Sequence, residues 1–394
     1  MQTSTRVRTH PGFWFGVAAT LLLLFGASAP SPFYPVLQDE LGFSALTMSL
    51  IFAIYALFLL MALLVSGSLS DHVGRRPVLS AGFVLLAVSM VMFWHADSVA
   101  GLLAARVVQG IATGLILSAL AALVVDFEPE GSGAASIYNS VFPMVGLASG
   151  ALVAGLVIET VASPLAWVFG ATAVTFLVIA AAVWVLPEPV DRRSGALRSL
   201  VPSVGLPAPA RAAFWRGAPA VVAGWATGGM YLSLGAPLVG RELGVGNHVV
   251  QGAVVTVMTG AGAVAVFAMQ RVSARGVMLY GTAVLALGTL LTLVALHLDS
   301  LLGFFLAAAL TGTGFGTAFF GFLRSVTPTV GPHQRGELFG AVFTFAYLSF
   351  GAPTVAAGLA IPHLGLVETT TIYGIVVAVL SATAWGLRRF TTTA

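Results

Sequence analysis

Residues 67–82 read GSLSDHVGRRPVLSAG, from Gly67 to Gly82, and they lie between two long apolar runs. The stretch holds three charged side chains and a histidine, although only 8% of the 394 residues of the chain are charged. Each flanking run is about 20 residues long, which is the length that an α-helix needs to cross a bilayer. We therefore interpret the stretch as a short loop at a membrane surface, between two spanning helices.

The composition places the whole chain in a membrane. Hydrophobic residues make up 58% of it and the mean hydropathy is +1.00, which is more apolar surface than a water-soluble core can hide. There is no Cys, and the seven His never fall at metal-ligand spacing, so we expect neither disulfides nor a metal site. Every basic residue is Arg, which excludes chemistry that needs Lys. We predict no cofactor, no nucleic-acid partner and no enzymatic activity.

Windows of roughly 20 apolar residues predict twelve transmembrane helices. They lie near 13–36, 44–66, 78–96, 99–125, 134–158, 164–186, 214–239, 248–270, 277–297, 300–326, 336–361 and 366–387. The first window has features of a cleavable signal peptide, but Pro30 directly follows the Ala-Ser-Ala motif and favours a spanning helix. All Arg except Arg106 and Arg241 gather on one side, so the positive-inside rule predicts that both termini are cytoplasmic.

One long connection, residues 187–213, is rich in Pro and Arg. It separates an N-terminal six-helix bundle, residues 1–186, from a C-terminal six-helix bundle, residues 214–394. At an offset of about 200 residues RPVLSAG (76–82) aligns with RGVMLYG (275–281), which indicates an internal duplication. We predict two halves related by a pseudo-two-fold axis along the membrane normal. The alternative is that Gly-rich helices resemble one another by composition alone.

The opening stretch has the form G-x-L-x-D-x-x-G-R-R and resembles the signature cytoplasmic loop of the major facilitator superfamily. The matching residues are Gly67, Leu69, Asp71, Gly74, Arg75 and Arg76. The resemblance covers the whole chain, since twelve spans in two six-helix halves are also the plan of that superfamily. It implies an all-α integral membrane protein, similar to drug and metabolite exporters, whose two bundles rock around a central cavity.

The charges of this loop are expected to form a cluster. Asp71 and Arg75 are one helical turn apart, and Gly67 and Gly74 allow the chain to turn around them. We expect Asp71 to cap the positive end of a neighbouring helix, and Arg75 to bind an acid such as Asp126. The resemblance implies that the cluster latches the two halves together on the cytoplasmic side. A solvated loop whose Arg residues only set topology is the alternative.

Arg106 lies well inside the fourth predicted span, three residues before Gln109 and on the same helix face. An unpaired Arg in hydrocarbon is costly, so it should face the bundle interior, a water-filled cavity or polar partners. The run R-x-x-Q-G-x-x-x-G resembles the fourth-helix motif of the superfamily, whose Arg is associated with proton coupling or anionic groups. We predict that Arg106 and Gln109 line the central cavity. An Arg that only binds backbone carbonyls is the alternative.

The fifth predicted span contains PMVGLASGALVAG, in which Gly146, Gly150 and Gly155 match most of the antiporter motif of the superfamily, G-x-x-x-G-P-x-x-G-G. Ala151 replaces the Pro of that motif, and Ala154 replaces a Gly. Small residues at this spacing let two helices pack closely, so we expect the glycines to form a helix contact. The motif favours proton-linked antiport, while the two replacements leave a facilitator open.

The predicted spans hold no clearly interior Asp or Glu, since Asp71, Asp126 and Glu159 lie at their boundaries. A cation pump normally needs a buried carboxylate, so we expect neutral, amphipathic or anionic substrates rather than cationic drugs. The side chains that we expect to bind substrate are Tyr34, Tyr55, Asn139, Phe142, Trp225, Tyr231, Phe315 and Phe319. For each aromatic residue, helix packing or a lipid-facing belt is the alternative.

Together these features predict a secondary active transporter, namely a proton-coupled exporter of small organic molecules that works by alternating access. The second hypothesis is an importer or facilitator of a sugar, carboxylate or other metabolite. The third is a non-transporting membrane receptor or lipid-handling protein. We expect a monomer in the inner cell membrane, whose partners are a small-molecule substrate, protons and the bilayer.

Overall fold

The computed structural model describes residues 10–191, 194–202 and 204–390, and this described part is helical, without a β-strand. The first eight helices are α1 (His10–Ser28), α2 (Phe33–Leu41), α3 (Ala45–Ser66), α4 (Ser70–Val73), α5 (Arg75–Trp94), α6 (Val99–Asp126), α7 (Ala134–Thr160) and α8 (Ala171–Ala182). The later ones are α9 (Ala208–Pro237), α10 (His248–Ala268), α11 (Ala274–His297), α12 (Leu301–Val326), α13 (Arg335–Leu364) and α14 (Leu366–Phe390). The short helical turns are η1 (Ala166–Gly170), η2 (Val183–Val185), η3 (Arg198–Leu200), η4 (Leu238–Glu242), η5 (Thr327–Thr329) and η6 (Pro332–Gln334).

Within the described residues, 11 helical segments are long and apolar enough to cross a membrane. Three of them are composite, because α1 and α2 form one segment, η1, α8 and η2 form another, and α12 and η5 form a third. The remaining predicted span coincides with α9, which is 30 residues long but less apolar, because it contains five Gly, three Pro and two Arg. Most of α9 from Phe214 onward is buried by other helices, so it needs less apolar surface than a lipid-facing helix.

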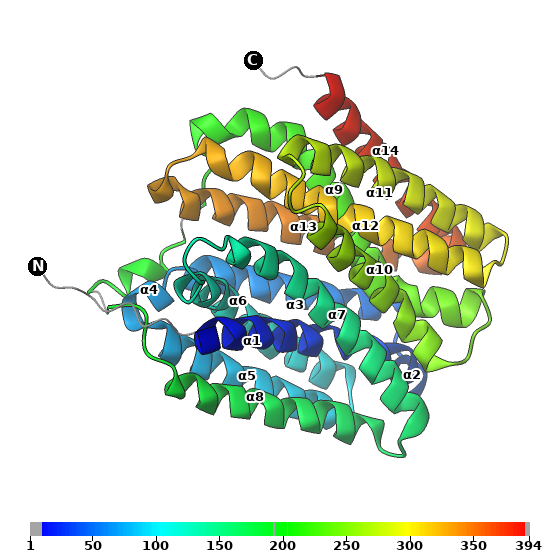
Figure 1. Cartoon of the computed structure of the whole chain (residues 1–394). Helices are drawn as coiled ribbons and strands as arrows, with labels where there is room; N and C mark the ends of the chain where they lie inside the picture. Colours follow the sequence, from blue (N-terminus) through cyan, green and yellow to red (C-terminus); the bar gives the residue numbers. More distant parts are fainter. Residues whose placement is uncertain (1–9, 192–193, 203, 391–394) are drawn as a thin grey trace, which may run out of the picture.

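The helices lie in two groups, α1–α8 and α9–α14, which occupy the lower and upper parts of Figure 1. In the first group α6 packs against α1, α3 and α5, and α8 packs against α5. In the second group α12 packs against α9, α10 and α11, and α14 packs against α9 and α11. Two long contacts join the groups, α7 with α10 and α3 with α13. We propose that the groups are the two bundles, connected by residues 187–213.

Polar caps set where several helices begin. The side chains that accept a hydrogen bond from a backbone N–H in the first turn of α3, α6, α10, α11 and α12 are Ser44, Ser98, Asn247, Ser273 and Ser300. The first N–H groups of a helix have no acceptor within the helix, and hydrocarbon offers none. A polar residue directly before each apolar run therefore supplies the missing acceptor.

The glycines of α7 lie where this helix touches its neighbours. A Cβ atom added at Gly146 or Gly150 would collide with a carbonyl oxygen of α1. A Cβ atom added at Gly155 would lie 2.6 Å from the carbonyl oxygen of His248, at the start of α10. The three glycines thus bring α7 close to one helix of its own group and to one helix of the other group.

We expect Gly150→Ala to destabilise the protein by about 1–3 kcal/mol, because the added methyl group has no space against Phe25 and Ser28 of α1. Gly386→Ala is the matched control, since this glycine is also helical and its added Cβ meets nothing within 4 Å. The control should unfold at the wild-type temperature or slightly above it. Thermal unfolding of the full chain in detergent measures both, and equal melting temperatures would contradict the close contact.

Candidate functional site

The loop between α3 and α5 turns at Gly74. This glycine has φ of 101°, a conformation that L side chains rarely adopt. The absence of a side chain also makes room for a carboxylate, since a Cβ atom here would lie 2.7 Å from Oε2 of Glu188. Gly74 is therefore needed both for the backbone turn and for the approach of Glu188, while Gly67 continues α3 with ordinary helical angles.

Arg75 is the centre of what we call the loop cluster: Ser70, Asp71, Arg75, Arg76, Asp126 and Glu188. Its Nη1 lies 2.5 Å from Oδ1 of Asp71 and donates to the Ser70 hydroxyl. Its Nε donates to Oδ2 of Asp126 at 3.0 Å. The side chain of Arg75 is only 8% exposed, and a cation so buried needs carboxylate partners. The contact of Arg75 with Asp126 that we expected is present in the structure.

The helix cap in the loop cluster comes from Glu188 and not, as we expected, from Asp71. Oε1 and Oε2 of Glu188 accept hydrogen bonds from the backbone N–H groups of Arg75 and Arg76, at 2.7 and 3.1 Å. These groups open α5, so a carboxylate there also meets the positive end of the helix dipole. Asp71 is instead held by the Arg75 guanidinium. The only signal for Glu188 in the sequence was an acid between two prolines, directly after the sixth span.

Arg76 anchors the same loop to the end of the sixth span. Its Nη2 donates to the carbonyl oxygen of Trp184 at 2.7 Å, and its guanidinium lies over the Trp184 ring at 4.9 Å. In the described part of the chain, the side-chain hydrogen bonds and ion pairs of Asp71, Arg75 and Arg76 all stay within residues 10–188. In this conformation the loop cluster therefore braces the first group and does not join the two groups.

Arg106 ties α6 to the break between α1 and α2. Its Nε donates to the Tyr34 hydroxyl at 2.6 Å, and its Nη1 donates to Oε1 of Gln109 at 2.5 Å and to the carbonyl oxygen of Ala27 at 3.3 Å. Gln109 in turn donates to the carbonyl oxygen of Gly26 at 2.8 Å. That carbonyl needs a side-chain donor, because the residue four positions later is Pro30, which has no N–H.

Four aromatic rings complete what we call the arginine cage; they belong to Tyr34, Phe52, Tyr55 and Phe93. Their centroids lie 5.2 to 5.4 Å from Cζ of Arg106. Such contacts stabilise a cation by its attraction to the ring faces, and no described carboxylate pairs with it. Arg106 is 1% exposed and Gln109 0%. In this conformation neither lines an open cavity, contrary to our expectation.

The second group presents what we call the aromatic face: Trp225, Phe319, Phe343 and Tyr347, of which Trp225 and Tyr347 lie where the groups meet. The ring of Trp225 lies edge-on to Tyr347 at 4.8 Å and to Phe319 at 5.4 Å, and Phe343 lies 6.4 Å from Tyr347. Trp225 and Tyr347 also pack against the hydrophobic core formed mainly by α1–α8. Tyr347 escaped the sequence analysis, although Phe339, Phe343 and Tyr347 repeat at four-residue spacing on one face of α13.

Two other predicted binding residues lie in the packing of the second group. Tyr231 is 1% exposed, and its hydroxyl is 2.9 Å from the hydroxyl of Thr292 on α11. Phe315 packs against α9, where a Cβ atom added at Gly228 would lie 3.1 Å from its ring. Tyr231 therefore joins α9 to α11, and Phe315 joins α12 to α9.

Asn139 and Phe142 lie on α7, away from the aromatic face. Nδ2 of Asn139 donates to the carbonyl oxygen of Ala121 at 3.0 Å, which links α7 to α6. Phe142 stacks on Tyr138 at 5.1 Å and lines an apolar groove of about 270 Å³ with Trp14 and Phe267. The structure thus brings Trp225 and Phe319 together, places Tyr34 and Tyr55 around Arg106, and leaves the remaining four in packing contacts.

The charged side chains that join the two groups in the described part of the chain lie at the opposite end of the helices from the loop cluster, which we call the far end. A further hydrogen bond between the groups, from the Thr256 hydroxyl to the carbonyl oxygen of Ala148 at 2.8 Å, lies farther along α10 and α7. Nη2 of Arg241 on η4 donates to Oε1 of Gln38 at 2.9 Å and lies 3.4 Å from Oδ1 of Asp39. Glu159, near the end of α7, accepts a hydrogen bond from the backbone N–H of His248 and lies 2.8 Å from its Nδ1. These contacts hold α2 against η4, which follows the end of α9, and hold α7 against the start of α10.

The described chain has two groups of membrane-spanning helices, a charged loop after its second span and a buried arginine in its fourth. This is the architecture of a membrane transporter. The sequence profile of the Major Facilitator Superfamily matches residues 16–354, well over half of the chain. The chain therefore belongs to the Major Facilitator Superfamily, as the loop motif predicted.

The chain is also similar to parts of two characterised relatives. It is 27% identical over 109 residues to the quinolone resistance protein NorA of Staphylococcus aureus, which covers 28% of this chain and 28% of that protein. It is 26% identical over 177 residues to the MFS-type transporter SLC18B1 of Rattus norvegicus, which covers 43% of this chain and 39% of that protein. The matches thus span well under half of the length of either relative.

We expect Glu188→Ala to destabilise the full chain by about 1–2 kcal/mol, because the first N–H groups of α5 lose their acceptor. Asp191→Ala is the matched control; it removes the same charge three residues later, from an exposed side chain. Thermal unfolding in detergent distinguishes the two. The cap would be ruled out by an Asp191 variant that loses as much stability as the Glu188 variant.

We expect Arg106→Lys to destabilise the protein by roughly 2 kcal/mol, because an ammonium group lacks the planar fork that reaches Tyr34, Gln109 and Ala27 together. Arg216→Lys is the matched control, since this Arg is exposed and its Nε donates to the carbonyl oxygen of Ala212 in its own helix. Both are measured by thermal unfolding. Wild-type stability of the Arg106 variant would show that the charge alone is needed.

Proposed function

We propose that this transporter is a proton-coupled exporter of small neutral, amphipathic or anionic organic molecules, and that it works by alternating access. The proposal rests chiefly on the aromatic face at the junction of the two groups. Its four rings offer flat apolar surface to a planar organic molecule, and the face contains no acid that would select a cation. Tyr55 of the arginine cage is on α3 and Tyr347 of the aromatic face is on α13, and these two helices pack against each other.

This position suggests how a substrate binds. A planar molecule placed against the rings of Trp225 and Tyr347 would stack on the aromatic face, while an anionic end would be drawn towards the Arg106 guanidinium behind Tyr55. A cationic molecule would meet the same guanidinium as a like charge. The preference for neutral, amphipathic or anionic substrates follows from this arrangement.

Alternating access requires that the contacts at the two ends change in turn. We propose that the loop end is cytoplasmic, as are both termini, and that the far end faces the outside of the inner membrane. Protonation of Asp126 would remove one of the two carboxylate charges that hold Arg75. A proton taken up at the loop cluster could thereby be coupled to rearrangement of α5 and α6 in a monomer.

An importer or facilitator is the second candidate, and α7 supplies the observation that favours it. Ala151 stands where the antiporter motif has Pro, and it is fully buried in the contact with α10, where a Cβ added at Gly252 would lie 2.6 Å from its carbonyl oxygen. α7 therefore lacks the Pro of that motif at its contact with the other group. Dependence of transport on a proton gradient separates the two candidates.

The test uses the full chain in proteoliposomes and a fluorescent quinolone, a class suggested by the name of the relative NorA. An acidic lumen should drive accumulation of the quinolone against its concentration gradient, and dissipating the pH gradient with an ionophore should abolish it. Accumulation only to equilibrium, with or without the gradient, would favour the facilitator. Absence of any quinolone movement would call for other neutral and anionic aromatic probes.

We expect Trp225→Ala to lower the rate of quinolone accumulation by about tenfold, because the substrate loses an aromatic stacking partner. Trp167→Ala is the matched control, since this side chain is 63% exposed on η1, away from the aromatic face. Initial rates at equal amounts of folded protein provide the comparison. Equal rates for wild type and the Trp225 variant would remove the aromatic face from the binding site.

A further inference from the structure

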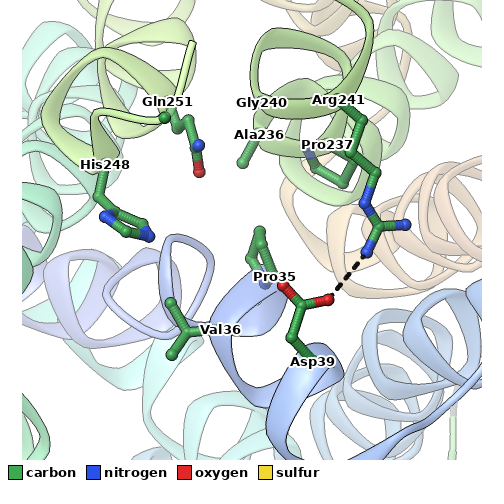
Figure 2. A pocket seen from close by; sticks show the side chains of 10 residues that line it. Pro35, Val36, Asp39, Ala236, Pro237, Gly240, Arg241, His248 and Gln251 are labelled. Carbon is green, nitrogen blue, oxygen red and sulfur yellow. Dashed lines mark hydrogen bonds and ion pairs between the residues drawn. The ribbon is translucent and has the colours of Figure 1, made fainter. Parts of the chain in front are cut away.

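A pocket of about 250 Å³ lies at the far end, between the two groups of helices. One wall is α2, with Pro35, Val36 and Asp39, and the facing wall belongs to α9, η4 and α10 (Figure 2). The facing wall is lined by Ala236, Pro237, Gly240, Arg241, Gly246, His248 and Gln251. An occupant of this pocket would touch both groups at once.

Gln251 places an unpaired acceptor in the pocket. Its side chain is more than nine-tenths buried, with 6% of the residue exposed, and its Nε2 donates to the carbonyl oxygen of Val245 at 2.9 Å. Because this bond assigns the nitrogen, the other amide atom is the oxygen, and Oε1 has no hydrogen-bond partner among the residues that the structure describes. Figure 2 shows the amide turned into the pocket, where Gly240 leaves space for it. A buried acceptor without a donor is costly.

The charges around the pocket favour a cationic donor. Asp39 lines the pocket, Glu40 and Glu242 directly follow the lining residues Asp39 and Arg241 in the chain, and Glu159 is paired with His248. Against them stand Arg241, which is already bonded to Gln38 and Asp39, and His248, whose Nδ1 is bonded to Glu159. The Asp39 carboxylate faces the Gln251 amide across the pocket (Figure 2) and keeps most of its surface free for a further partner, being 80% exposed.

We propose that this pocket binds a small organic ammonium ion. The N–H groups of the ion donate to Oε1 of Gln251 and to the carboxylate of Asp39, and its hydrocarbon part lies against Pro35 and Pro237. A neutral alcohol of the same shape lacks the charge, and a quaternary ammonium ion lacks the N–H donors. Both should therefore bind more weakly than the primary ammonium ion.

Binding is tested by calorimetry on the full chain in lipid nanodiscs, at neutral pH, with cyclohexylammonium chloride as the probe. We expect one site per chain, and dissociation constants about tenfold larger for cyclohexanol and for cyclohexyltrimethylammonium. Equal affinity for cyclohexanol would mean that the pocket is only apolar, and no heat of binding with any probe would mean that it holds water. Either outcome overturns the proposal.

Two variants locate the probe within the pocket. Asp39→Asn and Gln251→Leu should each weaken binding of cyclohexylammonium by about tenfold, and the exposed position of Asp39 makes its variant safe for folding. Glu40→Gln is the matched control; it removes a charge from the adjacent exposed acid, which does not line the pocket, and should change affinity by less than about twofold. Undiminished affinity in both the Asp39 and Gln251 variants would place the ion elsewhere and overturn the proposal.

A functional consequence rests on the proposed alternating access. Because the ion touches both groups, it should hold the far end closed and lower the maximal rate of quinolone transport, in wild type and in the Glu40 variant but not in the Asp39 variant. Binding and transport are separate measurements. If the ion binds as described while the chain moves no substrate, the proposed function fails and the site stands; if transport occurs without binding, the reverse holds.

Discussion

The free energy of placing a guanidinium in hydrocarbon governs how the first group of helices is packed. Arg106 cannot reach water from the middle of α6, so every favourable contact must come from neighbouring helices. The chain supplies these contacts by interrupting its first span. α1 ends at Ser28, and Pro30 leaves the carbonyl group of Gly26 without its helical donor, so that Gln109 can bond to it. The next helix, α2, begins at Phe33 and places the Tyr34 hydroxyl within hydrogen-bond distance of the Arg106 guanidinium. One buried charge thereby accounts for the break, the amide at Gln109 and the surrounding rings.

The two ends of the molecule use charge in different ways. In the loop cluster the Arg75 side chain is 8% exposed and binds two carboxylates, so breaking those bonds would leave a nearly buried cation unpaired. At the far end Arg241 is 49% and Asp39 80% exposed, and pairs so close to water contribute little each. The far end joins the two groups, whereas the loop cluster braces one. Weak ion pairs between groups and strong ion pairs within one group suit a molecule whose groups move as units.

Local sequence patterns predicted those features that depend on neighbours along one helix or on a known loop motif. Arg106 and Gln109 share a face because they are three residues apart, and the α7 glycines contact other helices because their spacing repeats. Glu188 was not predicted, because the backbone groups that it caps lie more than 100 residues earlier in the chain and only tertiary packing brings them together. Tyr347 was overlooked, although the four-residue spacing of Phe339, Phe343 and Tyr347 indicates that they share one helix face.

Other misses have a common physical cause. The sequence indicated that Arg106 needs polar surroundings, but water, carbonyl groups and aromatic rings all satisfy that need, and a linear pattern does not choose among them. The lower hydropathy of α9 likewise became interpretable only once other helices were seen to cover it. Both cases concern what surrounds a helix rather than what the helix contains.

The positions of the acidic residues also distinguish the ligand proposed at the junction of the two groups from the ion proposed at the far end. The junction of the two groups carries the aromatic rings of Trp225 and Tyr347, and the caged Arg106 cation lies within the first group behind Tyr55. The described carboxylates lie at helix ends or in loops, several of them at the far end. A small ammonium ion is stabilised at the far end by Asp39 and the Gln251 oxygen, but a step inward would exchange these partners for the guanidinium of Arg106. The far-end pocket is therefore better suited to holding the two groups of helices together than to passing its occupant inward. A cation bound there keeps the far end closed and is not itself the transported substrate.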